Sequence, residues 1–385
     1  PGGPPLGPTP PLPHLWPPGP AARVPAAPPR RGRPAALPPL PERPLVSVLI
    51  PVLNEAATIG ECLAAIEAQT YEHGYIEVIV ADGGSTDGTR AIVAERARAT
   101  TLRSLRLIDN PGRSTPSGLN EALRVAGGEV IQRIDGHTVV PPDFIAANVR
   151  ALRETGAAAV GGIIETRGRG RIGEAIALAM SHPFGVGGAR FRTGGPAGPV
   201  DTVPMAAYRR ACFERLGGFP EANKGEDDAF HFLIRQAGGT VYLDPRIRSV
   251  YYCRPTYHAL AVQYFGYGRA RGRALVERPR SARVRHVVPA ASLAAGAAAM
   301  AGAGLSPAAR WLAQMLSGAY VLLAAGAAVH AASRHRAWTL APLTVLAFPV
   351  MHAAYGAGTF VGVAEAAVRR LTPTRKAWPA RTAAR

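Results

Sequence analysis

Residues 76–89 read IEVIVADGGSTDGT: a continuous apolar run ends at Asp82, and a glycine-rich polar turn follows it. An upstream apolar run over residues 46–50 ends just as abruptly at Pro51. Short apolar runs bounded by turn residues are typical of strands that are covered on both faces, as in a parallel sheet. We therefore expect two neighbouring buried strands, each followed by a polar turn.

The same alternation of strand and helix signals continues to residue 164. Helical spacing is found at 58–66, 89–97, 117–126 and 142–154, and strand-like runs at 105–108, 130–134 and 158–164. Short connections between such elements predict an α/β fold, a mostly parallel sheet with helices on both faces. Ligands bind at the carboxyl ends of parallel strands. The residues of interest therefore directly follow the strands: Asn54, Glu55, Asp82, Asp87 and Asp135.

Residues 165–200 are rich in glycine and arginine and show little periodicity. We expect them to form an irregular, mobile segment near the site. Beyond them, the pattern predicts helices at 208–216 and 229–237 and short strands at 240–243 and 249–252.

The charge distribution separates two classes of partner. The chain has 385 residues and a formal net charge of +18, and only Lys224 and Lys376 among its 44 basic residues are lysine. Two thirds of the net charge lies in residues 1–45 and 287–385, outside the expected α/β domain. A nucleic-acid-binding protein would concentrate positive charge on its folded domain. The distribution therefore favours a membrane surface and argues against a nucleic-acid partner.

Three segments near the end of the chain lack charged side chains, and each exceeds the ~20 residues needed to cross a bilayer: 287–309, 311–333 and 337–364. The first is mostly alanine and glycine, so we expect it to lie along the membrane and the other two to span it. Two spans keep the α/β domain and the basic residues after Glu365 on one side, the cytoplasmic side. A buried helical bundle is the alternative.

The expected organisation has four parts. A disordered, proline-rich arm covers 1–44, and the catalytic α/β domain covers 45–286. Membrane helices follow at 287–366, and a basic tail at 367–385 ends the chain. The three cysteines are too widely spaced for a disulfide framework or a zinc site, which fits a reducing compartment.

Four polar motifs carry residue types suited to chemistry, and each also has a purely structural interpretation. Asp82 and Asp87 suit hydrogen bonds to a ribose or a base, or the capping of a turn. The Asp-Gly-His sequence at 135–137 suits a divalent cation that keeps waters and substrate phosphates, or an ordinary turn. The carboxylates at 226–228 suit a general base or a helix N-terminus. The arginines within 263–273 suit a diphosphate or anionic lipid.

Taken in order, these motifs resemble those of the family 2 glycosyltransferases, which have the GT-A fold. The resemblance is strongest to the membrane-associated subgroup that includes the succinoglycan-synthesis glucosyltransferases. It covers roughly residues 45–275. The matching segments are Val46–Glu55, Val80–Thr89, Arg133–His137, Gly217–Phe219, Glu226–Asp227 and Gln263–Gly268.

The resemblance implies a role for each motif. Asp227 would be the catalytic base, with Glu226 beside it, and Asp135 and His137 would hold Mg²⁺ or Mn²⁺. A nucleotide-sugar donor, expected to be a UDP-sugar, would be bound by Pro51, Asn54, Glu55, Asp82, Asp87, Arg133, Gln263, Tyr267 and Arg269. The reaction would be a metal-dependent, inverting transfer of a sugar to a lipid-linked or glycan acceptor. It would take place at the cytoplasmic face of the inner or plasma membrane, in cell-surface exopolysaccharide synthesis.

Three departures from the family pattern qualify these roles. His137 stands where many relatives carry a second aspartate, Gly266 replaces a larger residue, and arginines at 269–273 replace an Arg-Trp ending. A nucleotidyltransferase is one alternative, but it would need a glycine-rich basic loop where this chain has Asn54 and Glu55. A non-catalytic, membrane-anchored scaffold is the other.

Overall fold

The computed structural model describes residues 37–221 and 225–371. The chain divides into two compact units, Pro1–Cys253 and Arg254–Arg385. Most of the expected proline-rich arm, residues 1–36, and residues 372–385 of the expected basic tail lie outside the described residues. The boundary between the two compact units therefore comes earlier in the sequence than the domain boundary expected at 286/287. The expected boundary stays a prediction.

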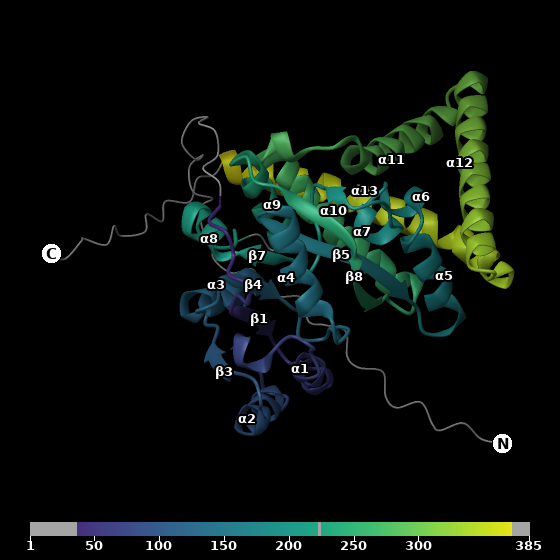
Figure 1. Ribbon diagram of the computed structural model, residues 1–385. Coiled ribbons are helices and arrows are strands. Elements are labelled where there is room, and N and C mark those ends of the chain that lie inside the picture. The colour runs from purple at the N-terminus through teal and green to yellow at the C-terminus, as the bar shows by residue number, and fades with distance from the viewer. Residues whose placement is uncertain (1–36, 222–224, 372–385) are drawn as a thin grey trace, which may run out of the picture. The chain divides into compact units, whose positions relative to one another are not determined.

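The first unit is built on an eight-stranded sheet with the order β3-β2-β1-β4-β7-β5-β8-β6 (Figure 1). The strands are β1 (Val46–Val52), β2 (Ile76–Asp82), β3 (Ser104–Asp109), β4 (Val130–Arg133), β5 (Ala159–Arg167), β6 (Gly198–Pro199), β7 (Ala207–Arg209) and β8 (Val241–Tyr252). Strand β7 pairs antiparallel with both β4 and β5, so those two strands run in the same direction. Strands β1 to β5 and β8 therefore all end at one edge of the sheet. The expected mostly parallel α/β fold is confirmed.

Helices cover both faces of this sheet. They are α1 (Ile59–Glu67), α2 (Thr89–Ala99), α3 (Thr115–Val125), α4 (Phe144–Thr155), α5 (Gly170–Met180), α6 (Pro183–Val186), α7 (Arg190–Thr193), α8 (Arg210–Leu216) and α9 (Glu226–Gln236), with a 3₁₀ turn at His73–Tyr75. Successive residues of β1 join different apolar clusters: Val48 packs in one, and Leu49 in the other. This two-sided burial explains the continuous apolar run in the sequence.

One expectation about this unit is wrong. Residues 165–200 are not wholly irregular, because Gly170–Met180 form helix α5. All of the residues from Ala175 to Met180 are buried. Its apolar residues do follow helical spacing, at Ile172, Ala175, Ile176 and Ala179. The glycines at 170 and 173, which are unfavourable inside a helix, weakened that signal.

The second unit is helical. It contains α10 (Tyr257–Glu277), α11 (Val284–Ala303), α12 (Pro307–Arg334) and α13 (Ala341–Leu371), with 3₁₀ turns at Pro279–Ser281 and Trp338–Leu340. Three helical stretches are long and apolar enough to cross a membrane: Val284–Ala303, Pro307–Arg334 and Trp338–Leu371. The stretch rich in alanine and glycine has the lowest mean hydropathy, 1.3. The expected count of two spans stays a prediction.

Helices α10 and α13 approach each other through glycines on both sides of the contact: Gly268, Gly272, Gly358 and Gly362. A Cβ atom added at Gly268 would lie 1.9 Å from the carbonyl oxygen of Tyr355, and one at Gly358 would lie 2.1 Å from that of Phe265. The two backbones are thus closer than any side chain would allow. Small residues at a helix interface permit this kind of packing in membrane proteins.

We predict opposite effects for two Gly→Ala substitutions in this unit. Gly268→Ala should lower the thermal midpoint of the full chain in detergent, because overpacking costs ~1–3 kcal/mol. Gly318→Ala, on α12, is the matched control, since its Cβ would have no atom within 4 Å and alanine favours a helix by ~1 kcal/mol. Equal shifts in the two midpoints would contradict the close packing of α10 and α13.

Candidate active site

The turns after β1 and β2 are hydrogen-bonded to each other. The amide of Asn54 donates to Ser85 Oγ (2.8 Å), and the amide of Thr86 donates to Asn54 Oδ1 (2.9 Å). The amide of Glu55 donates to Thr89 Oγ1 at 2.8 Å. Asn54 has φ 55°, a left-handed conformation that asparagine tolerates better than most residues. The two turns therefore form one fixed platform at the edge of the sheet.

Asp82 is buried at the base of this platform, and its two oxygens differ. Oδ2 accepts hydrogen bonds from the amides of Gly84 and Ser85 (3.0 Å each) and from Arg90 Nη1 (2.8 Å). Oδ1 is also buried but has no hydrogen-bond partner among the described residues. Burial raises the pKa of Asp82, but the hydrogen bonds from Ser85 and Arg90 outweigh it and hold the pKa below its ordinary value. The carboxylate is therefore ionised, with one oxygen left to accept from a ligand.

Asp87, in the same turn, has a different role. Its Oδ1 accepts from the amide and the hydroxyl of Thr89 (3.1 and 2.6 Å), and its Oδ2 accepts from the amide of Ala56 (3.0 Å). These contacts match the turn-capping interpretation. A contact from Asp87 to the donor stays a prediction, as does the one from Pro51, which is a residue of β1.

The guanidinium of Arg133 joins three carboxylates at the centre of the sheet edge. Arg133 is the last residue of β4 and is 7% exposed. Its Nη1 lies 2.7 Å from Glu226 Oε1 and 2.5 Å from Asp227 Oδ1, both in the first turn of α9. Its Nη2 lies 3.0 Å from Asp135 Oδ1. The site thus brings together Asp135 and the 226–227 pair, which are far apart in the sequence.

This cluster drives the carboxylate pKa values in opposite directions. Burial raises the pKa of Glu226 and of Asp227, against the opposing effect of Arg133. Burial also raises the pKa of Asp135, but the charges of Arg133 and His137 outweigh it and lower that pKa below its ordinary value. Neighbouring groups with diverging pKa values mark an acid–base site. Glu226 and Asp227 therefore take up a proton more readily than Asp135 does, and the role of Asp227 as a base stays a prediction.

The residues expected to hold a metal offer a partial set of ligands. Asp135 follows β4, and two residues later the Nδ1 of His137 is hydrogen-bonded to Glu55 Oε1 at 3.1 Å. Among residues 37–221 and 225–371, no group of three or more His, Cys, Asp or Glu side chains could hold a metal ion. Mg²⁺ commonly takes one or two carboxylates and completes its shell with waters and substrate phosphates. The Asp135 carboxylate is the kind of ligand that such an ion takes, and a metal held by Asp135 and His137 stays a prediction.

Two buried residues near Asp227, Tyr208 and His231, were not identified from the sequence. Tyr208 Oη, on β7, donates to Asp227 Oδ1 at 3.4 Å. The Tyr208 ring stacks on the ring of His231 with centroids 5.4 Å apart, and a 2.9 Å hydrogen bond joins His231 Nδ1 to Thr202 Oγ1. The four-residue spacing from Asp227 to His231 places both on one helix face. That spacing was the available signal for His231.

The three remaining candidates lie on α10, in the second unit. Gln263 Nε2 donates to Tyr267 Oη at 3.0 Å. Arg269 Nη2 pairs with Glu365 Oε1, on α13, at 2.5 Å. Donor binding by Gln263, Tyr267, Arg269 and the buried Arg133 stays a prediction.

His231 should make stability depend on pH. Burial lowers its pKa to about 3, whereas an unfolded histidine takes up its proton near pH 6.5. Between those values the unfolded state binds more protons, so acidification below pH 6.5 costs ~1.4 kcal/mol per pH unit. We predict that His231→Asn loses less stability than the wild type between pH 7.5 and pH 5.5, as measured by thermal midpoints. His73→Asn, on the 3₁₀ turn, serves as control. Identical pH dependence in His231→Asn and the wild type would contradict the assignment.

Comparison with known proteins agrees with this geometry. The family model described as "Glycosyl transferase family 2" matches residues 47–217. The succinoglycan biosynthesis protein ExoA of Rhizobium meliloti is 31% identical over 314 residues, which cover 81% of this chain and 92% of ExoA. The dolichyl N-acetyl-α-D-glucosaminyl phosphate 3-β-D-2,3-diacetamido-2,3-dideoxy-β-D-glucuronosyltransferase of Methanococcus voltae is 26% identical over 234 residues, covering 59% of this chain and 73% of that protein.

A solved structure shares the fold. The mannosyltransferase PcManGT of Pyrobaculum calidifontis, in complex with GDP-Man and Mn²⁺, superposes with a TM-score of 0.53 at 24% identity. The match covers 94% of this chain and 92% of that one. The resemblance seen in the sequence motifs is thereby confirmed. With a GT-A sheet and a relative of this identity and coverage, the chain belongs to family 2 of the glycosyltransferases.

Proposed function

We propose that the protein transfers a sugar, with inversion at the anomeric carbon, from a nucleotide-sugar to a lipid-linked or polysaccharide acceptor in cell-surface glycan synthesis. The expected donor is a UDP-sugar. The observation that carries the proposal is the Arg133 cluster, in which the guanidinium of Arg133 contacts three carboxylates at the carboxyl edge of the sheet. They are the ionised Asp135 and the two buried neighbours Glu226 and Asp227. The name of the similar ExoA protein, from succinoglycan biosynthesis, supports the class of product.

The donor would bind at the platform formed by the turns after β1 and β2. Asp82 Oδ1 is a buried, ionised acceptor without a partner among the described residues, which suits an N–H of a base or an O–H of a ribose. Asp135 and His137 would hold Mg²⁺ or Mn²⁺ against the diphosphate. A bound divalent cation there would neutralise the charge that develops on the leaving diphosphate.

Asp227 would accept the proton of the attacking acceptor hydroxyl. Its buried surroundings raise its pKa, which brings a carboxylate closer to the pH at which it works as a base. Tyr208 and Arg133 both contact Asp227 Oδ1, and they would fix the orientation of the carboxylate. One base and one attack from the face opposite the leaving group give inversion.

The membrane is part of the proposal. The second unit has three helical stretches that are long and apolar enough to cross a bilayer, so an acceptor held in the membrane is the natural substrate. The basic residues after Glu365 would keep this end of the chain on the cytoplasmic side of the inner or plasma membrane.

Removal of the base should stop transfer without loss of donor binding. Asp227→Asn should slow transfer by ~10²–10⁴-fold, because the amide cannot take the proton. It removes one of three negative charges around Arg133, so the fold should survive. Asp228→Asn, the next residue of the same helical turn, is the matched control and should retain activity. Transfer at the wild-type rate by a folded Asp227→Asn variant would refute the base assignment.

A panel of UDP- and GDP-sugars would test the donor and the metal. We predict that the detergent-solubilised protein releases nucleoside diphosphate from one donor only when Mg²⁺ or Mn²⁺ is present. Asp135→Ala should lose both this release and the metal-dependent part of donor binding, as measured by calorimetry. Equal donor affinity with EDTA and with Mn²⁺ in the wild type would argue against a metal at Asp135 and His137.

A further inference from the structure

Helices α10 and α13 run side by side in the same direction. Near the start of the contact, Tyr257 Oη donates to the carbonyl oxygen of Leu343 at 2.7 Å. Near its end, the guanidinium of Arg370 donates to the carbonyl oxygen of Val276. The close approach through glycines described above lies between these two points. The first residues of both helices therefore lie at one end of the pair, and their last residues lie at the other end.

Helix α10 has too short an uncharged stretch to cross a bilayer. It carries Arg269, Arg271 and Arg273, so its uncharged part is confined to residues 257–268. A helix of that length rises ~18 Å, whereas the hydrocarbon core is ~30 Å thick. Because the ends of the two helices coincide, α13 could cross only together with α10. The arginines of α10 therefore oppose a crossing by either helix.

The two ends of the pair connect to parts of the chain that belong on one side of a membrane. The first unit ends at Cys253 and α10 begins at Tyr257, so the start of the pair lies on the side of the first unit. The residues after Glu365, at the other end, are basic, and basic segments favour the cytoplasmic side. The proposed function places the first unit on that same side. An α13 that crossed would put the first unit and these basic residues on opposite sides.

The turn between α12 and α13 is also basic. Arg334 is the last residue of α12, and His335 and Arg336 follow it. A span at 337–364, as expected from the uncharged sequence, would put this turn on the side away from the first unit. That placement is opposite to the usual distribution of arginine, which favours the cytoplasmic side. The charge of the turn therefore agrees with an α13 that does not cross.

Both helices combine exposed apolar side chains with an excess of positive charge. The exposed apolar residues include Val262 and Phe265 on α10, and Phe360 and Val361 on α13. Within residues 254–371, the many arginines are opposed by only two acidic residues in the sequence, Glu277 and Glu365. Apolar side chains beside unbalanced arginines suit the interface of a bilayer that contains anionic lipids.

We infer that α10 and α13 lie together along the membrane interface on the side of the first unit, and that α13 does not cross the bilayer. The partner of this helix pair is the lipid leaflet on that side. Anionic headgroups would meet the arginines, and acyl chains would meet the exposed apolar side chains. An even number of crossings can then come only from α11 and α12. The inference rests on the proposed function only where it names that side the cytoplasmic one.

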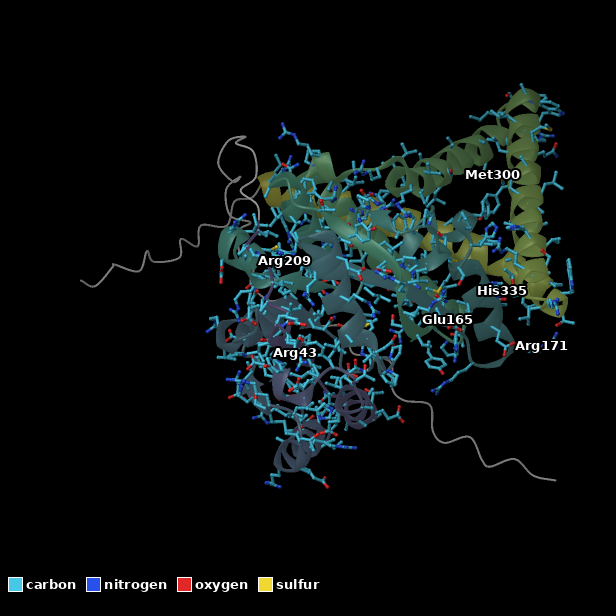
Figure 2. The ribbon with its side chains drawn as sticks, in the orientation of Figure 1. Arg43, Glu165, Arg171, Arg209, Met300 and His335 are labelled. Carbon is cyan, nitrogen blue, oxygen red and sulfur yellow. The ribbon has the colours of Figure 1, made fainter. Side chains whose placement is uncertain are left out.

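Labelling of the turn between α12 and α13 tests the side on which α13 begins. His335, labelled in Figure 2, is the exposed C-cap residue of α12, and His335→Cys keeps both arginines of the turn. Arg98→Cys, at an exposed position on α2, marks the side of the first unit. The native cysteines are buried. In sealed membrane vesicles of known orientation, an impermeant maleimide should label both variants in the same preparation. Labelling of His335→Cys only in vesicles of the opposite orientation would overturn the inference.

The depth of residues along α13 gives an independent test. Leu346, Ala353 and Phe360 are exposed and follow one another at intervals of seven residues on α13. A nitroxide on a single cysteine at each position, in the full chain in vesicles of phosphatidylcholine and phosphatidylglycerol, reports depth through its exposure to oxygen and to a water-soluble nickel chelate. A helix along the interface should give three depths within ~5 Å, about one helical pitch. A crossing helix would spread them over ~20 Å, and that result would overturn the inference.

Failure of this inference is distinct from failure of the proposed function, because neither measurement needs sugar transfer. The substituted positions lie outside the Arg133 cluster and the platform formed by the turns after β1 and β2, so UDP binding with Mn²⁺ should be equal in the wild type and in all variants. Depths that match an interfacial α13 in a protein without transferase activity would count against the transfer reaction alone. Depths that match a crossing helix in an active protein would count against this inference alone.

Discussion

The buried ion pairs of Arg133 hold the centre of the first unit together. Three carboxylates converge there, and each would be costly to bury without a cation, because an unpaired charge in a protein interior costs several kcal/mol. Arg133 contacts all three, so the end of β4 and the start of α9 are tied to one another. The separation between Asp135 and Asp227 is thereby set by one planar side chain, and a transferase needs that separation fixed across its two substrates.

The mixed sheet explains why this cluster lies where it does. Short β7 runs antiparallel between β4 and β5, and it divides the sheet into one half with the order β3-β2-β1-β4 and a second half with the order β5-β8-β6. The hydroxyl of Tyr208, on β7 between the two halves, donates a hydrogen bond to Asp227 Oδ1. Asp227, the proposed base, therefore lies where the two halves of the sheet join.

Local features could be predicted from the sequence, and long-range ones could not. The apolar runs identified β1 and β2 because burial on both faces and turn residues are properties of adjacent residues. Helix α5 was missed because glycines at 170 and 173 obscure the helical spacing of its apolar residues. The motif singled out Arg133 as a candidate for donor binding, which stays a prediction. Its partners at 226–227 lie more than ninety residues away in the sequence, and no spacing rule relates such positions. His231 had a local signal, the helical spacing from Asp227, but its burial depends on Tyr208.

The hydrogen bonds of Asp82 and Asp87, in the turn after β2, distinguish a ligand contact from a turn cap, which their spacing in the sequence does not. The sequence offers Asp82 and Asp87 equally as ligand contacts or as caps. Both oxygens of Asp87 are engaged by groups of the two turns, at Ala56 and Thr89, so its carboxylate holds the platform in shape. Oδ2 of Asp82 likewise accepts hydrogen bonds from amides of the turn, at Gly84 and Ser85. Oδ1 of Asp82 is buried and has no hydrogen-bond partner among the described residues. A buried acceptor left unmatched costs free energy, and in the proposed complex a nucleotide that donates to Asp82 Oδ1 would recover it.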